Sequence, residues 1–235
     1  MKTFADRYFE ACNNVDVDFK QILKLLDNNP SDSILEIGAG TGRLLPIYSG
    51  RPGRVDLVES SSDIIQILND EIRKGKNLNL CVRQGYSFCL PYEDNSFNFV
   101  LIPFAGISEM SPLMFTLAEC YRVLKPKGLL YFTAINPQAS SQTSSQKFII
   151  EQVCPSFKSW ADLVALSNFN LIEAKGSFDD DEFKIEQSQI VKIVAEKCSS
   201  PQLQARTKNS HIASGAYDRL APKYNEISGG EHYHV

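Results

Sequence analysis

Short apolar runs alternate with amphipathic segments along most of this 235-residue chain. Five runs have the length and composition of buried strands, at residues 33–37, 54–58, 78–83, 97–102 and 128–135. Apolar side chains recur at helical spacing in three segments, at residues 19–26, 64–72 and 112–124. Strands that alternate with helices predict a doubly wound α/β fold, in which helices cover both faces of a mostly parallel sheet.

Boundary residues agree with these elements. Asp18 is placed to cap the first helix, and Pro30 stops the chain from continuing it. The serines at 60–62 are placed to cap the second helix, and Gly75 closes it.

Two later apolar runs, at 171–178 and 188–195, flank the acidic residues 179–182. They predict an antiparallel hairpin that completes a seven-stranded sheet. The acidic run resembles a metal site, but a solvated turn explains it better, and we expect no metal.

The most informative segment is the turn after the first strand, with glycines at 38, 40 and 42. Glycine adopts backbone angles that other residues avoid and lets a ligand approach without meeting a Cβ atom. The second strand runs into Glu59, a carboxylate placed to accept hydrogen bonds from two ribose hydroxyls. Together these features predict a site for a nucleoside-bearing cofactor.

The glycine spacing narrows the choice of cofactor. A dinucleotide site has the pattern G-x-G-x-x-G, whose third small residue packs a helix against a strand. Counted from Gly38, that position is occupied by Arg43. The pattern is instead G-x-G-x-G preceded by Glu36, which disfavours a nicotinamide-dependent dehydrogenase.

These residues resemble the class I S-adenosylmethionine-dependent methyltransferases, and more narrowly their small-molecule branch called methyltransferase type 11. Four features match the family's motifs in order, over roughly residues 30 to 196: the segment 35–42, the acid Glu59, the block 90–100 and the block 119–130. The resemblance implies a Rossmann-like fold and S-adenosylmethionine as cofactor.

The resemblance also implies a set of cofactor-contacting residues. They are Glu36, Gly38, Ala39, Gly40, Thr41, Gly42, Glu59, Ser60, Tyr86, Ser87, Pro103 and Phe104. The resemblance implies that Glu36 orients the amino group of the cofactor, directly or through water. It also implies that the carbonyls at Pro103 and Phe104 line the methyl-transfer pocket.

The chain departs from the family at its adenine contact, where an Asp and a small residue are usual and Tyr86 and Ser87 stand here. Tyr86 either flanks the adenine or fills the core, and Ser87 is able to hydrogen-bond the adenine amino group. No catalytic base is predicted: Glu109, Tyr8 and the histidines are better explained as solvated, capping or pocket-shaping side chains.

We expect a methyltransferase domain at 1–198, with cap helices at 1–30, and a linker plus helix-like tail at 199–235. The polar segment 136–146 reads either as a lid or as a plain connection. Residues 216–225 resemble the opening of a methyltransferase, so the tail either begins a second methyltransferase unit in the same reading frame or folds over its own domain.

Composition sets the class of partner. The formal net charge is -4 without a cluster of Lys or Arg, so a nucleic-acid partner is not expected. Six cysteines without a C-x-x-C pair indicate reduced, mostly buried thiols in a cytoplasmic protein. Neither a signal peptide nor an apolar run of membrane-spanning length is present, so no membrane partner is expected.

The expected function is transfer of a methyl group to an O, N or C atom of a small molecule or peptide. The segment 102–105 differs from the Asn/Asp-Pro-Pro-aromatic signature of enzymes that methylate exocyclic amino groups. The alternative is a partner subunit that binds the cofactor but is catalytically inactive.

Overall fold

The computed structural model describes residues 19–27, 32–75, 79–103, 110–135, 157–176 and 190–199. All of them except Ser199 belong to the compact unit Met1–Cys198. Several expectations fall outside the described residues. They concern the cap segment before residue 19, Phe104, Glu109, the segment 136–146, the acidic turn at 179–182, and the tail from residue 200 with its histidines.

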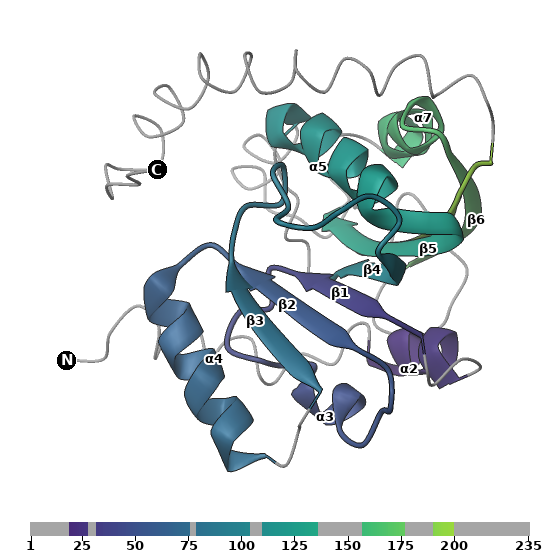
Figure 1. Cartoon of the computed structure of the whole chain (residues 1–235). Helices are drawn as coiled ribbons and strands as arrows, with labels where there is room; N and C mark the ends of the chain where they lie inside the picture. Colours follow the sequence, from purple (N-terminus) through teal and green to yellow (C-terminus); the bar gives the residue numbers. More distant parts are fainter. Residues whose placement is uncertain are drawn as a thin grey trace, which may run out of the picture. The chain divides into compact units, whose positions relative to one another are not determined.

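The described strands form a seven-stranded sheet in the order β3-β2-β1-β4-β5-β7-β6. The strands are β1 (Ile34–Ile37), β2 (Val55–Glu59), β3 (Leu80–Gln84), β4 (Phe97–Ile102), β5 (Leu124–Ile135), β6 (Phe169–Gly176) and β7 (Ile190–Lys197). The first five are parallel, whereas β7 runs antiparallel to both β5 and β6. The predicted fold, including its C-terminal antiparallel hairpin, is therefore confirmed (Figure 1).

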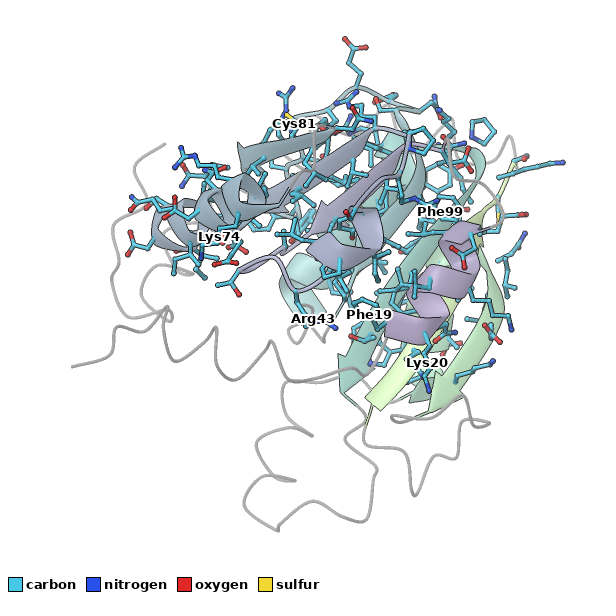
Figure 2. The ribbon with its side chains drawn as sticks, turned by 90° about the horizontal axis from the view of Figure 1, so that it is seen from below. Phe19, Lys20, Arg43, Lys74, Cys81 and Phe99 are labelled. Carbon is cyan, nitrogen blue, oxygen red and sulfur yellow. The ribbon has the colours of Figure 1, made fainter. Side chains whose placement is uncertain are left out.

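Helices cover both faces of this sheet. They are α2 (Phe19–Asp27), α3 (Leu45–Tyr48), α4 (Ser62–Lys74), α5 (Met110–Val123) and α7 (Phe157–Leu166). Figure 1 shows α5 and α7 on one side and α2, α3 and α4 on the other. Figure 2 looks from below, where α2, with Phe19 and Lys20 labelled, and α4, with Lys74 labelled, lie across the sheet.

Alternation along the strands divides the core into the two layers that these helices cover. On β1, Ile34 packs with α2, α3 and α4, whereas Leu35 packs with α5 and α7. On β2, Leu57 and Val58 divide in the same way. All residues of β1 and β2 are buried, which is the burial expected of central parallel strands.

The junction between α5 and β5 differs from the prediction, because the strand starts at Leu124 and not at 128. The carbonyls of Arg122 and Val123, at the end of the helix, accept hydrogen bonds from the amides of Asn95 and Ser96 (2.9 and 2.8 Å). These bonds satisfy acceptors that a helix end otherwise leaves free. A register shift in β4 between Phe97 and Phe99 then absorbs the Lys-Pro-Lys-Gly segment, so pairing begins early.

The caps of α4 agree with the sequence prediction, whereas the burial of the cysteines does not. Ser61 is the N-cap of α4 and Gly75 its C-cap, as predicted. The expectation of mostly buried thiols is wrong for the described part of the chain, where Cys81 and Cys89 are exposed. Helices α3 and α7 were not predicted at all. Within the described residues, no helix combines the length and apolarity that crossing a bilayer requires.

Lys197 lies at the end of β7, and its side chain is buried, with 8% of the residue exposed to solvent. It donates to the Leu124 carbonyl and to Asn95 Oδ1, and it lies 4.4 Å from the centre of the Tyr121 ring. Burial lowers the pKa of Lys197 below its ordinary 10.5.

This lowered pKa predicts a pH-dependent stability. The unfolded chain keeps the Lys197 proton to a higher pH than the folded chain does. Stability therefore rises as pH increases from the lowered pKa toward 10.5. In urea denaturation, we expect the free energy of unfolding of the native protein to rise over this range relative to that of Lys197→Met. Parallel profiles for the two proteins would contradict the expectation.

Candidate functional site

The glycine turn after β1 is fastened to the neighbouring strand. The amides of Gly38 and Ala39 both donate to the Val58 carbonyl, at 2.8 and 3.1 Å. Gly38 has a φ of 72°, in the left-handed region that favours glycine. A Cβ atom built on Gly38 would meet no atom of the described residues within 4 Å. The backbone is therefore open at this residue, as the approach of a ligand requires.

Gly42, in the same turn, has a different surrounding. Its φ is 91°. A Cβ atom there would lie 2.6 Å from Leu45 Cδ1 and 2.9 Å from Leu68 Cδ1. Both leucines belong to the core under α3 and α4. The structure thus gives Gly42 a packing role between turn and helices, alongside any role toward the cofactor.

Glu59 joins the glycine turn to the start of α4. Its side chain is 8% exposed, and Oε2 accepts the Gly40 amide at 3.0 Å. The other oxygen, Oε1, accepts the amides of Ser60 and Ser61 at 2.8 and 3.0 Å and the Ser60 hydroxyl at 3.3 Å. A carboxylate offers about four lone-pair sites, so Glu59 is held in one orientation by donors on both sides.

Glu36 lies on β1, on the face that α2 and α3 cover. Its Oε2 accepts the hydroxyl of Tyr48, in α3, at 2.8 Å, and both side chains are buried. Tyr48 therefore fixes the orientation of this second carboxylate close to the glycine turn.

Thr41, in the glycine turn, has a buried side-chain hydroxyl. Its side chain is 3% exposed, and Oγ1 has no hydrogen-bond partner in the described part of the chain. Buried hydroxyls are nearly always hydrogen-bonded, since burial without a partner costs free energy. An unsatisfied hydroxyl within the glycine turn fits a polar ligand bound there.

Tyr86 and Ser87 belong to a turn that leaves β3 beside Glu59. The Gly85 amide donates to the Glu59 carbonyl at 3.0 Å, and the Cys89 amide closes the turn on the Tyr86 carbonyl at 3.1 Å. The Tyr86 ring stacks on that of Phe88, with centroids 5.3 Å apart and planes 11° apart.

The predicted site residues thus meet at one edge of the sheet. Glu36 is the penultimate residue of β1, the glycine turn follows that strand, Glu59 ends β2, and Tyr86 follows β3. The three strands are parallel neighbours. Pro103 follows β4 at the same edge and is buried, whereas Phe104 is outside the described residues. Ligands of doubly wound sheets bind at this carboxyl edge. The domain therefore has an α/β fold whose predicted site residues gather at the edge where such folds bind ligands.

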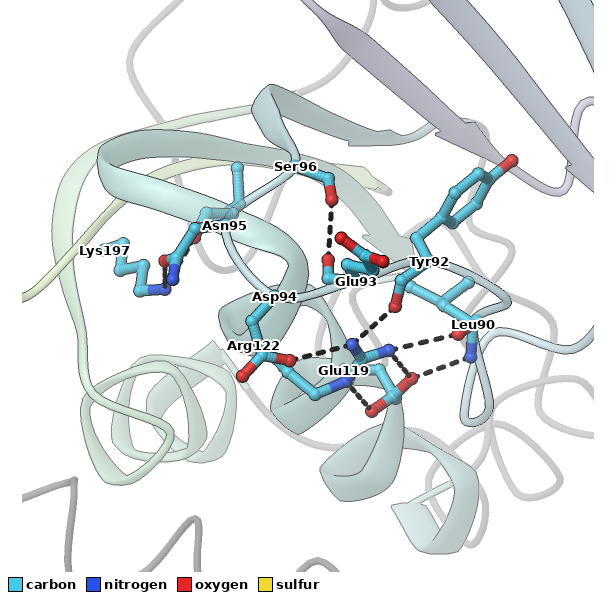
Figure 3. A network of polar contacts seen from close by, with 10 residues as sticks. Leu90, Tyr92, Glu93, Asp94, Asn95, Ser96, Glu119, Arg122 and Lys197 are labelled. Atoms are coloured by element: carbon cyan, nitrogen blue, oxygen red, sulfur yellow. Dashed lines mark hydrogen bonds and ion pairs between the residues drawn. The ribbon is translucent and has the colours of Figure 1, made fainter.

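The structure adds three polar residues of α5 that sequence reasoning did not assign to the site. Thr116 Oγ1 lies 2.7 Å from Ser87 Oγ. Glu119 and Arg122 bind each other and the backbone that follows the Tyr86 turn, as Figure 3 shows. The hydrogen bond with Glu119 is the main reason that the pKa of Arg122 is raised. The available signal was the i, i+3 spacing of Glu119 and Arg122.

Comparisons with known proteins agree with this reading. Residues 34–128 match the protein family described as Methyltransferase domain. The demethylmenaquinone methyltransferase of Shouchella clausii (strain KSM-K16) is 30% identical over 112 residues, which are 46% of this chain and 47% of that protein. The structure of the CcbJ methyltransferase from Streptomyces caelestis has a TM-score of 0.71 at 14% identity, covering 84% of this chain and 97% of that one. A SAM dependent methyltransferase from Aquifex aeolicus has a TM-score of 0.66 at 17% identity, covering 84% and 100%.

At these identities the structural likeness establishes the fold alone, and the family match is limited to residues 34–128. The chain spans about half the length of the curated relative that it matches. The matched residues contain the glycine turn and Glu59. Within residues 34–128 the chain is therefore similar to the methyltransferase domain family, and its fold is that of the solved methyltransferases.

The residues at the sheet edge fit the cofactor of this family, S-adenosylmethionine. The open Cβ position of Gly38 leaves space beside the turn, and the unpartnered Thr41 hydroxyl matches the polar amino-acid end of the cofactor. Glu59 has two carboxylate oxygens that a ribose diol would share with the protein donors or take from them.

Proposed function

We propose that this chain transfers a methyl group from S-adenosylmethionine to an O, N or C atom of a small molecule or peptide. One observation carries the proposal. The buried carboxylate of Glu59 binds the amide of Gly40, two residues after the open backbone position of Gly38, at the carboxyl edge of the sheet.

The bound cofactor supplies an activated methyl group on a positively charged sulfur. The contribution of the chain is to hold the cofactor in one orientation: Glu59 binds the ribose, Gly38 leaves room, and Thr41 offers a hydroxyl to the polar end. Well-oriented reactants gain about 7–11 kcal/mol in comparable intramolecular reactions. Orientation therefore suffices for much of the rate, and an added base is needed only where the acceptor carries a proton at the reacting atom.

The family match, residues 34–128, includes the residues that hold the cofactor in our proposal. It supports the reaction type and leaves the acceptor open. We therefore confine the proposal to a small-molecule or peptide acceptor.

Calorimetry with S-adenosylmethionine and S-adenosylhomocysteine tests the first part of the proposal. We expect both to bind with a Kd well below 1 mM, which corresponds to about -4 kcal/mol. Transfer of labelled methyl groups into pools of small molecules and peptides tests the second part. Failure of both ligands to bind at millimolar concentration would refute the proposal. Binding without transfer to any pool would favour the inactive partner subunit.

A further inference from the structure

Helix α5 presents two kinds of side chain at regular spacing. Leu113, Leu117 and Cys120 are fully buried in the core between the helix and the sheet. Thr116 and Glu119 are three residues apart, so they lie on one side of the helix. With Arg122, three residues further, they form a polar stripe, and each of the three side chains makes a hydrogen bond to the segment between residues 87 and 94.

This polar stripe holds both the middle and the end of the Tyr86 turn. Thr116 Oγ1 contacts Ser87 Oγ at 2.7 Å. Glu119 Oε2 accepts the Leu90 amide at 2.7 Å, and Arg122 Nη2 donates to the Leu90 carbonyl at 3.1 Å. Both backbone groups of Leu90 are therefore bound by side chains of α5.

The guanidinium of Arg122 is used completely. Nε and Nη2 donate to the two oxygens of Glu119, both at 2.7 Å, in a bidentate pair. Nη1 donates to the Tyr92 carbonyl at 2.6 Å and to Asp94 Oδ1 at 3.0 Å (Figure 3). Together with the bond to Leu90, these contacts occupy all five N–H groups of a rigid, planar fork. Lysine has no such fork and is a poor substitute at a bidentate site.

The start of the same turn is bound to Glu59, because the Gly85 amide donates a hydrogen bond to the Glu59 carbonyl at 3.0 Å. The turn thus runs from the residue assigned to the ribose to the polar stripe of α5. A base attached to a ribose at Glu59 would lie against this turn, since β3 is the strand next to β2.

We propose that Thr116, Glu119 and Arg122 are positioning residues that set the place of Tyr86 and Ser87 against the nucleobase. Thr116 orients the Ser87 hydroxyl, and the pair of Glu119 and Arg122 fixes the end of the turn. This inference rests on the proposed function. It assigns base recognition to a helix whose residues need not touch the cofactor.

A double-mutant cycle tests the role of Thr116. Thr116→Val and Ser87→Ala are each expected to weaken binding of S-adenosylhomocysteine about 3- to 10-fold, as loss of one neutral hydrogen bond does. Because Thr116 acts through Ser87, the double variant should bind no more weakly than Ser87→Ala alone. Equal effects of Thr116→Val in both backgrounds, or no effect on affinity, would overturn the assignment.

Arg122→Lys tests the end of the turn. It keeps the charge but loses the fork, so we expect at least 10-fold weaker binding of S-adenosylhomocysteine together with a lowered thermal midpoint. The matched control is Arg73→Lys, because Arg73 makes an exposed i, i+3 pair with Asp70 on α4 (2.9 Å). It should leave the affinity unchanged. A lowered midpoint with normal affinity in Arg122→Lys would show a purely structural role and refute the proposal.

The two proposals fail in different ways. If the native chain does not bind S-adenosylhomocysteine, the proposed function fails and this inference fails with it. If the native chain binds normally and the Thr116 and Arg122 variants bind as it does, only the positioning role is refuted.

Discussion

Replacing Glu59 with alanine is expected to weaken cofactor binding at least 100-fold. The change removes the carboxylate that we propose as acceptor for two ribose hydroxyls, and hydrogen bonds to a charged group are worth about 1.5–3 kcal/mol each. A loss of about 3 kcal/mol already corresponds to more than a 100-fold change in Kd. Calorimetric titration of native and variant protein with S-adenosylhomocysteine measures the effect.

The same substitution also affects folding, which the experiment must separate. Glu59 accepts the amides of Gly40, Ser60 and Ser61. A buried N–H left without an acceptor costs about 1–3 kcal/mol. We therefore expect a lower free energy of unfolding in Glu59→Ala, measured by urea denaturation.

Two further variants isolate the effect on binding. Glu59→Gln keeps the size of the side chain and one carbonyl oxygen, so it should fold better than the alanine variant and still bind weakly. Glu71→Ala is the control, because Glu71 is a carboxylate on α4 that forms an i, i+3 ion pair with Lys74. Native affinity in folded Glu59→Gln and Glu59→Ala would show that the ribose lies elsewhere.

The sequence predicts the elements near the cofactor well because several local signals coincide there. The run Ile34–Ile37 is apolar except for Glu36, and the glycines follow it directly. The end of β2 at Glu59 follows from a second apolar run that a carboxylate terminates. Such signals depend on neighbours in the chain, so they can be read without the fold.

The positions of β5 and the roles of α5 depend on contacts that the chain order does not contain. Pro126 and Gly128 indicate a strand that starts late, but Leu124 already pairs with Phe97 across a register shift. Glu119 and Arg122 have the spacing of an ordinary pair on a helix surface. Only the packing of α5 against the loop from Leu90 shows that the pair binds backbone groups.

The glycine motif shows the same limit at the scale of single residues. The sequence of the motif predicts a turn, yet it does not distinguish a glycine that faces open space from one that faces a leucine side chain. That distinction requires the position of α4, which supplies Leu68 from residues far along the chain.

Alanine at Gly42 is therefore expected to reduce mainly the stability, and alanine at Gly38 mainly the affinity for the cofactor. Gly42→Ala places a methyl group against Leu45 and Leu68 in the buried core, where overpacking costs about 1–3 kcal/mol. The left-handed backbone adds about 1–2 kcal/mol of strain. The variant should lose about 2–5 kcal/mol of stability in urea unfolding, while the folded fraction still binds the cofactor.

Gly38→Ala carries only the backbone strain of about 1–2 kcal/mol, because its Cβ meets nothing within 4 Å. Its methyl group projects into the space assigned to the cofactor, so S-adenosylhomocysteine should bind at least 10-fold more weakly. The comparison is internal, since both variants add one methyl group to one turn with a positive φ. A Gly38→Ala protein that binds normally would place the cofactor away from this turn, and the site proposed at Glu59 would then lose its neighbour on β1.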